Sequence, residues 1–230
     1  MLLIWISALT LSSLAAAQDD SPPTSYPSLP KVAAKAGDFV APGWTVVSKA
    51  VGDLNGDRHA DVALALWPVE ASDAEQHDVA RQQPYRLVIA FARSKGGYQL
   101  IEDNRTFLQP PDLSAINNDP IEPNSLRIFQ GALQVSRTYL RGQYHYRFRW
   151  MNHAFRLIEY YFSGSDGHCV SETNINFLTR RAKLESEELS ENAIDHKAVR
   201  KTRARLASLA EAGSDAFYPE QLIIGTQPEC

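Results

Sequence analysis

Apolar and polar positions alternate along much of this chain, which is the two-residue period of a β-strand with one buried face. Two runs, residues 60–67 and 86–92, are instead apolar at nearly every position, and this indicates central strands covered on both faces. Sustained alternation with few helical periods predicts an all-β fold of mostly antiparallel meander sheets, propeller-like or arranged as a sandwich. The other predicted strands are residues 44–51, 97–104, 126–135, 143–150, 154–162 and 174–179.

Three stretches depart from this pattern. Residues 69–84 are polar and tolerant of helix, and they form an insertion between the two central strands. Residues 108–125 are rich in Pro and Asn, and loops of that length are often functional or mobile. Residues 197–212 are compatible with a short helix or with a basic strand followed by a turn. They follow an acidic segment, and opposed charge blocks of this kind are usually solvated faces or a flexible excursion.

The composition suits one globular domain. Of the 230 residues, 44% are hydrophobic and 22% are charged, which allows a sizeable core. We assign residues 36–230 to a single all-β domain and the Pro-rich residues 18–35 to a tether. The net charge of −4 argues against a general nucleic-acid binder.

The first 17 residues predict the compartment. Residues 1–17 contain no charged side chain and end in three alanines. An apolar stretch followed by small residues is typical of a secretory signal peptide, so we expect a periplasmic or secreted protein. A retained N-terminal anchor is the alternative. No other run approaches the roughly 18 apolar residues of a membrane helix, so we expect no membrane span after signal removal.

The two cysteines, Cys169 and Cys230, fit an exported chain. An even number of cysteines in such a chain favours a disulfide. Closing a loop of roughly 60 residues stabilises a fold by about 4 kcal/mol in the chain-entropy model. Two free thiols are the alternative.

Residues 53–61, which we call the acidic loop, crowd oxygen-bearing side chains directly before a central strand. Asp53, Asn55, Asp57 and Asp61 occupy positions 1, 3, 5 and 9 of the loop, and the carbonyl of His59 stands at position 7. A Ca²⁺ ion takes about six to eight oxygen ligands, and alternate residues of a tight loop can all point inward. We therefore predict one structural calcium ion here. A solvated, Asx-rich turn without metal is the alternative.

The acidic loop resembles the calcium loop of FG-GAP/VCBS repeats, which occur in integrin-type β-propellers. The resemblance covers residues 52–66 and implies a calcium site. Those repeats usually have Gly after the third ligand, where this chain has Arg58. If that position requires a positive φ, the Arg side chain costs about 1 kcal/mol and loosens the site. The loop occurs once, so a propeller of calcium-bearing repeats is not supported.

A broader likeness covers residues 42–184, which resemble small exported bacterial FG-GAP-like proteins. Some members of that group are periplasmic inhibitors that protect cells against peptidoglycan-cutting toxins. The resemblance implies a protein-binding or inhibitory, immunity-type module in the periplasm. Its implied partner is an envelope hydrolase or toxin.

The strands 143–150 and 154–162 predict a hairpin that turns at Asn152 and His153. In that register one face carries Tyr146, Phe148, Trp150, Phe155, Leu157 and Glu159. The opposite face carries His145, Arg147, Arg149, Arg156 and Tyr160. Arg149 then lies opposite Arg156, which is unfavourable unless an anion or acidic partner neutralises the pair. The face is either a docking surface for an acidic partner or polyanion, or a solvated face balanced by Glu or Asp of a neighbouring strand; the pattern favours the second interpretation.

No catalytic motif is evident in the sequence. The six histidines are scattered, without the His-Glu-x-x-His spacing of a zinc site, and no Gly-x-Ser-x-Gly elbow occurs. We therefore expect a binding or inhibitory module and not an enzyme. The alternative is a hydrolase of a cell-envelope polysaccharide or of peptidoglycan, whose paired carboxylates meet only in space.

Overall fold

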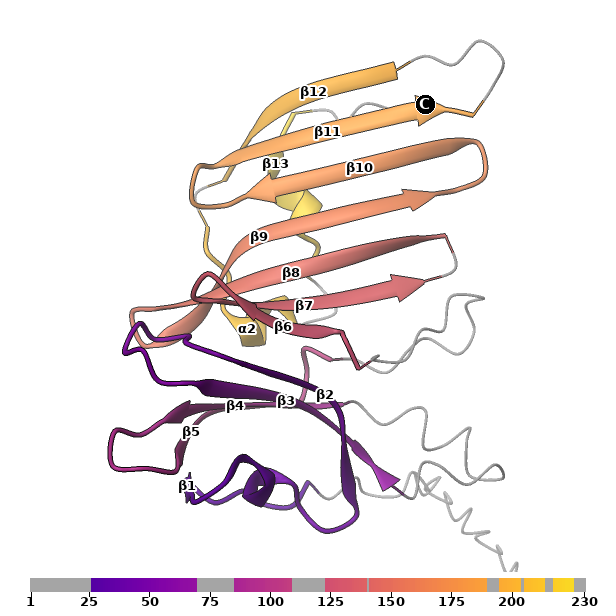
Figure 1. Ribbon diagram of the computed structural model, residues 1–230. Helices are drawn as coiled ribbons and strands as arrows, with labels where there is room; N and C mark the ends of the chain where they lie inside the picture. The colour runs from indigo at the N-terminus through magenta and orange to yellow at the C-terminus, as the bar shows by residue number, and fades with distance from the viewer. Residues whose placement is uncertain are drawn as a thin grey trace, which may run out of the picture.

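The strands of this protein form two open antiparallel sheets (Figure 1). The computed structural model describes residues 26–69, 85–108, 123–139, 141–189, 195–203, 205–213 and 217–225. The first sheet has five strands in the order β1-β5-β4-β3-β2, and the second has eight in the order β13-β12-β11-β10-β9-β8-β7-β6. The predicted all-β, mostly antiparallel fold is confirmed, with two sheets as in a sandwich.

The five-stranded sheet contains both predicted central strands. Its strands are β1 (Val32–Ala33), β2 (Trp44–Gly52), β3 (Asp61–Pro68), β4 (Arg86–Ala92) and β5 (Tyr98–Asn104). The first six residues of β3 and of β4 are all buried, so side chains on both faces of these strands are covered. One face packs against the larger sheet, and the other is covered by the N-terminal segment, which includes the 3-10 helix η1 (Ala36–Phe39).

The eight-stranded sheet is a meander from β6 to β12. Its strands are β6 (Leu126–Phe129), β7 (Ala132–Tyr139), β8 (Gly142–Met151), β9 (Ala154–Ser165), β10 (Cys169–Asn176), β11 (Arg181–Glu188), β12 (Asp195–Thr202) and β13 (Ile223–Ile224). The predicted run 126–135 is divided by a turn at Gln130 and Gly131, whose φ angles are 50° and 67°. The chain then returns behind the sheet through α2 (Leu209–Ala212) and the 3-10 helix η3 (Pro219–Leu222) (Figure 1).

Strand β11 was not predicted, because its sequence is dominated by charge. Only Ala182, Leu184 and Ser186 of this strand are buried, and the alternating residues are Lys, Arg or Glu. Of the two alternatives for residues 197–212, a short helix or a basic strand followed by a turn, the structure shows the second. A basic strand ends at Thr202, and only the four residues of α2 are helical.

The two sheets share one hydrophobic core. Phe91 of β4 packs edge-on against Trp150 of β8, with ring centroids 5.1 Å apart, and also contacts Phe155 of β9. Residues 26–35, part of the predicted Pro-rich tether 18–35, are packed on the small sheet, where Tyr26 contacts the ring of Trp44. Because both faces of β3 and β4 are covered in this way, the loops at their ends are held in place.

Some predicted segments lie outside the described residues. They are the signal peptide 1–17, most of the insertion 69–84, most of the loop 108–125, and Cys230. In the ranges that are described, no helix has the length and hydropathy needed to cross a membrane.

Candidate functional site

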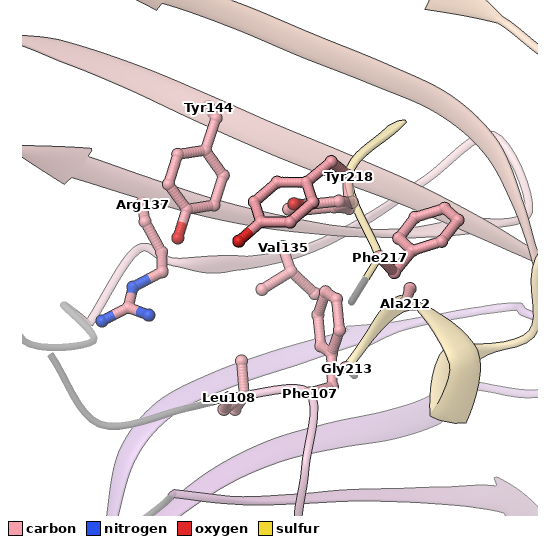
Figure 2. A pocket seen from close by; sticks show the side chains of 10 residues that line it. Phe107, Leu108, Val135, Arg137, Tyr144, Ala212, Gly213, Phe217 and Tyr218 are labelled. Atoms are coloured by element: carbon pink, nitrogen blue, oxygen red, sulfur yellow. The ribbon is translucent and has the colours of Figure 1, made fainter. Parts of the chain in front are cut away.

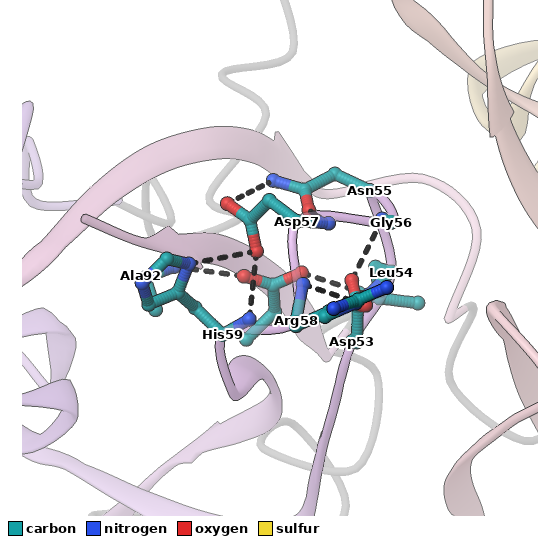
Figure 3. A network of polar contacts seen from close by, with 9 residues as sticks. Asp53, Leu54, Asn55, Gly56, Asp57, Arg58, His59 and Ala92 are labelled. Carbon is teal, nitrogen blue, oxygen red and sulfur yellow. Dashed lines mark hydrogen bonds and ion pairs between the residues drawn. The ribbon is translucent and has the colours of Figure 1, made fainter. Parts of the chain in front are cut away.

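The acidic loop between β2 and β3 is organised by side-chain oxygens that accept backbone N–H groups (Figure 3). One carboxylate oxygen of Asp53 accepts from the N–H of Gly56 at 2.7 Å, and the other accepts from the N–H of Arg58 at 2.9 Å. Gly56 and Arg58 both have positive φ, 84° and 68°. Arg58 therefore occupies a backbone conformation that favours glycine, as the comparison with FG-GAP/VCBS loops anticipated.

Asn55 and Asp57 continue the same pattern. Asn55 Oδ1 accepts from the N–H of Asp57 at 2.9 Å, and Asp57 Oδ1 accepts from the N–H of His59 at 2.8 Å. The Asn55 side-chain amide donates to the other oxygen of Asp57 at 3.1 Å. The backbone hydrogen bond from His59 is the main cause that lowers the pKa of Asp57. Asp57 is therefore a carboxylate at neutral pH.

Asp61 closes the acidic loop from inside the protein. Its side chain is fully buried; Oδ2 accepts from the N–H of Leu54 at 2.8 Å, and Oδ1 accepts from the N–H of Ala92 in β4 at 2.8 Å. Burial raises the pKa of Asp61 most, and the charges of Asp57 and Asp53 raise it further, against the two hydrogen bonds. The three carboxylates are thus close enough to repel one another, which is a condition that a bound cation relieves.

The donor set of the acidic loop suits a hard cation, although its groups do not converge as placed. A carboxylate oxygen that accepts one N–H keeps a further lone pair for a metal ion. Within the described ranges, however, no three His, Cys, Asp or Glu side chains are grouped so that they could hold a metal. The oxygens of Asp53, Asn55, Asp57 and Asp61 instead accept backbone N–H groups. The calcium ion stays a prediction.

Strands β8 and β9 form the predicted hairpin, with a turn at Asn152 and His153, whose φ angles are 51° and 60°. Arg149 lies directly opposite Arg156, as predicted. In the part of the chain that the structure describes, neither guanidinium forms an ion pair with an acidic side chain. We call the face that carries Arg147, Arg149 and Arg156 the arginine face.

A β-bulge at Ile158 changes the register of β9. Arg147 is opposite Glu159 and Phe148 is opposite Leu157, so Ile158 is the extra residue between the two pairs. A bulge inserts one residue into one strand, and every side chain beyond it changes face relative to unbroken alternation.

The bulge reverses the predicted faces of two residues. Glu159, predicted on the apolar face, lies on the arginine face, 2.8 Å from Arg147 Nη1 and 3.7 Å from His145 Nε2. Tyr160, predicted on the arginine face, is 5% exposed and lies opposite Tyr146 on the core side. Both predicted placements are wrong. The contact with His145, together with the charge and hydrogen bond of Arg147, holds the pKa of Glu159 below its ordinary value.

The acidic loop and the arginine face are connected through packed side chains. Asp61 accepts the N–H of Ala92, and the adjacent Phe91 ring packs edge-on against Trp150 at 5.1 Å. Trp150 directly follows Arg149 in β8. These two contacts link the acidic loop to the hairpin that carries the arginines.

An aromatic cavity of about 200 Å³ lies between the inner face of the large sheet and the C-terminal segment. Figure 2 shows Arg137 and Tyr144 at one side of it and Phe217 at the other. Burial raises the pKa of Tyr146 in its wall far above the ordinary value. No sequence signal marked this cavity, because its walls come from separate segments. The lining residues are Phe107, Leu108, Val135, Arg137, Tyr144, Tyr146, Ala212, Gly213, Phe217 and Tyr218.

Two carboxyl groups in the described ranges have raised pKa values, Asp61 and Glu102. Burial is the main cause for both. The charges that raise the pKa of Asp61 belong to Asp53 and Asp57, and the charge that raises that of Glu102 belongs to Asp103. The two raised carboxyl groups therefore do not act on one another.

Comparison with family models, with curated proteins and with solved structures gave no match to this chain. The likeness to FG-GAP/VCBS loops thus rests on residues 52–66.

Proposed function

We propose that this protein is an exported, non-catalytic binding module that docks an acidic partner protein through its arginine face. The observation that carries the proposal is the direct pairing of Arg149 with Arg156, without an acidic side chain that neutralises either one in the described ranges. Like charges directly opposite on neighbouring strands destabilise a sheet. An acidic partner that lies over the pair neutralises it, and Arg is well suited to bind carboxylates through two parallel hydrogen bonds.

The alternative interpretation, a solvated face balanced by acidic residues of a neighbouring strand, accounts for only one of the three arginines on this face. Glu159 of the neighbouring strand neutralises Arg147, as a solvated and internally balanced face requires. The bulge at Ile158 places Glu159 opposite Arg147. On the turn side of the bulge, Arg149 remains opposite Arg156. The unneutralised charge is therefore concentrated at the turn end of the hairpin.

A calcium ion in the acidic loop has a supporting role in this proposal. The Ca²⁺ ion supplies positive charge among Asp53, Asp57 and Asp61, whose mutual repulsion is felt at Asp61. Asp61 holds the N–H of Ala92, next to the Phe91 ring that packs on the arginine hairpin. A metal that orders the acidic loop thereby steadies the docking surface without touching the partner.

The identity of the partner rests on the resemblance. Small exported FG-GAP-like proteins include inhibitors of peptidoglycan-cutting toxins, so we propose an envelope hydrolase or toxin as the partner and an inhibitory, immunity-type role. The periplasmic or secreted location rests on the predicted signal peptide in residues 1–17.

Charge reversal at Arg149 separates docking from stability. Arg149→Glu places a carboxylate opposite Arg156, so the free energy of unfolding should rise by about 0.2–1 kcal/mol. Capture of the partner from envelope extract, and its binding after purification, should nevertheless weaken at least about tenfold. Lys95→Glu is the matched control, because Lys95 is exposed in the β4–β5 turn and changes the net charge equally. It should leave both quantities unchanged.

Two results would contradict the proposal. The first is capture that Arg149→Glu and Lys95→Glu affect equally, since the arginine face would then contribute only net charge. The second supports the hydrolase alternative: purified protein that releases fragments from peptidoglycan, with turnover abolished by one Asp or Glu substitution outside residues 53–61.

A further inference from the structure

The arginine face is one part of a longer row of paired residues that crosses the large sheet. Direct pairing links neighbouring strands from β6 to β12 at a single level of the sheet. In strand order the row consists of Arg127, Gln134, Arg147, Glu159, Asn176, Arg181 and Lys201. Directly paired residues project from the same face. With about 4.8 Å between strands, the row spans about 29 Å.

The row is strongly basic. Glu159 is its only acidic member, and Arg147 already neutralises it. Arg127, Arg181 and Lys201 are exposed, and none of them forms an ion pair with any described residue. Together with Arg149 and Arg156 at the next level, we call these cations the basic band, which consists of Arg127, Arg147, Arg149, Arg156, Arg181 and Lys201.

The β12 end of the basic band borders a groove. The groove has a volume of about 640 Å³ and is lined by Thr179, Arg180, Arg181, Val199, Arg200 and Lys201. Four of these side chains are cationic and none is acidic. Arg180 adds its charge from the β10–β11 turn, where its φ is 58°. An anionic chain that follows the band can therefore continue into a basic concavity.

The opposite end of the same face carries three glutamates, of which Glu185 has Lys183 at 3.7 Å and Lys197 directly opposite, and this restricts the occupant. Glu172 of β10 lies directly opposite Glu185 of β11, and Glu187 follows two residues further along β11. A broad anionic surface, such as a membrane, would cover these carboxylates together with the basic band. A narrow segment that runs across the strands along the band avoids them.

An aromatic side chain beside the band favours a protein segment over a plain polyanion. Phe129 is 51% exposed, and it lies on the same face as Arg127, two residues away in β6. Exposed aromatic and arginine side chains are the usual energetic centres of protein interfaces. A polymer of repeating anions has no apolar group for Phe129 to bury.

We infer that the basic band binds an extended acidic segment of a partner protein, about nine residues long at roughly 3.3 Å per residue. The segment lies across the strands from β6 to β12, and its carboxylates face the cations of the band. This inference rests on the proposed docking function and extends it by naming the length, direction and charge of what is bound.

The test uses the full-length protein and a fluorescein-labelled nine-residue peptide of seven glutamates with a leucine at each end, so that one leucine can contact the exposed Phe129. Binding is followed by fluorescence anisotropy at low salt. Arg181→Glu and Lys201→Glu each reverse a charge far from the hairpin, and each should raise the Kd about threefold to tenfold. Lys95→Glu, with the same change in net charge, should alter the Kd less than about twofold. Raising the salt concentration should weaken binding of the wild-type protein more than that of the two band variants.

The outcomes separate the band from the arginine face. If Arg149→Glu weakens binding and the Arg181 and Lys201 variants do not, the band is wrong and the docking proposal stands. If none of the three variants weakens binding, or the peptide does not bind, both are wrong. A Lys95→Glu effect as large as theirs overturns the band, because only net charge then matters. Tighter binding of phosphatidylglycerol vesicles or dextran sulfate than of the peptide overturns the choice of a protein segment.

Discussion

Arg86 in β4 is completely buried, and its charge is balanced by Asp103 of β5. Two parallel hydrogen bonds join the guanidinium to the carboxylate, at 2.6 and 2.7 Å, and a third reaches the carbonyl of Pro27 at 2.7 Å. Arg105 contacts the same carboxylate from the surface at 3.0 Å and lies over the Tyr26 ring. This network attaches the N-terminal segment to the small sheet.

Asp103→Asn should therefore lower the free energy of unfolding by about 3–5 kcal/mol, because it leaves the buried Arg86 without its counter-charge. Arg105→Gln removes the exposed partner of the same carboxylate and should cost less than about 1 kcal/mol. Urea unfolding at neutral pH measures both. Equal effects of the two substitutions would show that the burial of Arg86 does not set the energy.

The carboxylate of Asp103 also makes the free energy of unfolding depend on pH. Burial acts to raise the pKa of Asp103, but the hydrogen bonds and charges of Arg86 and Arg105 outweigh it, and the pKa lies below the ordinary value. A lowered pKa adds stability above the ordinary Asp pKa, and this stability is lost as the pH falls through the lowered value. Urea unfolding between pH 7 and pH 2 should show this loss in the wild-type protein and less of it in Asp103→Asn.

A single residue, Arg58, also lowers the calcium affinity that we expect of the acidic loop. Its φ of 68° costs an Arg about 1 kcal/mol relative to Gly. Millimolar Ca²⁺ added to EDTA-treated protein should raise the Tm, because a ligand bound only by the native state stabilises it. Arg58→Gly should enlarge the rise, and Arg58→Ala, which keeps the unfavourable φ, should not. Asp57→Ala should abolish it. Identical melting curves with and without calcium would exclude the site.

The β8–β9 hairpin turns on two residues that both have positive φ, Asn152 at 51° and His153 at 60°. Two-residue hairpin turns of this kind match the twist of the flanking strands, and Asn-Gly is the pair that they favour. The second position here is therefore occupied by a residue that the turn does not prefer. The turn holds the register that places Arg149 opposite Arg156.

His153→Gly should accordingly raise the free energy of unfolding by about 0.5–1 kcal/mol, because Gly adopts this conformation without steric cost. His153→Ala is the control, since it removes the ring and keeps the positive φ; it should give no such gain. Guanidinium unfolding followed by circular dichroism measures both variants. A stabilisation that the Ala variant shares would trace the effect to the His153 ring and its contact with Trp150.

At the scale of the whole molecule, the C-terminal segment covers the inner face of the large sheet. Gly213, directly after α2, lies so close to the backbone of Phe107 that a Cβ there would be 2.6 Å from it. Strand β13 then runs antiparallel to the end of β12, toward the end of the sheet at which Cys169 lies opposite Glu188. Cys169 is buried and is not a free thiol. Its predicted partner, Cys230, lies outside the described residues.

Peptide mapping under non-reducing conditions should recover one cross-linked pair, Cys169–Cys230. Reduction should lower the free energy of unfolding by up to about 4 kcal/mol, because a loop of roughly 60 residues is then no longer closed in the unfolded chain. Cys230→Ser should reproduce the effect of reduction, and reducing agent should not destabilise that variant further. Two cysteines that label freely with an alkylating reagent before unfolding would contradict the pairing.

The sequence by itself determined the features that depend on neighbouring residues in the chain. Consecutive apolar positions marked β3 and β4 as strands covered on both faces, and alternation located most of the other strands. The spacing of Asp53, Asn55 and Asp57 marked the acidic loop as a calcium site or, alternatively, an Asx-rich turn, and in the structure these side chains accept backbone N–H groups. Arg58, where related loops have Gly, has a positive φ. The burial pattern of a strand and the conformation of a turn both depend on residues that are close together in the sequence.

Only the tertiary structure decided the features that depend on hydrogen-bond register between strands. The bulge at Ile158 moved Glu159 onto the arginine face and Tyr160 into the core, and no local pattern marks where one strand gains a residue against its partner. The sequence did not predict strand β11, because only three of its residues are buried and its exposed face is charged. The row from Arg127 to Lys201, which carries four cations of the basic band, exists only because six pairings bring residues that are distant in sequence to one level of the sheet. Alternation specifies the face of a side chain only where a strand is unbroken. The bulges and the register, which are set by the whole sheet, decide which face follows a bulge and what lies beside each side chain.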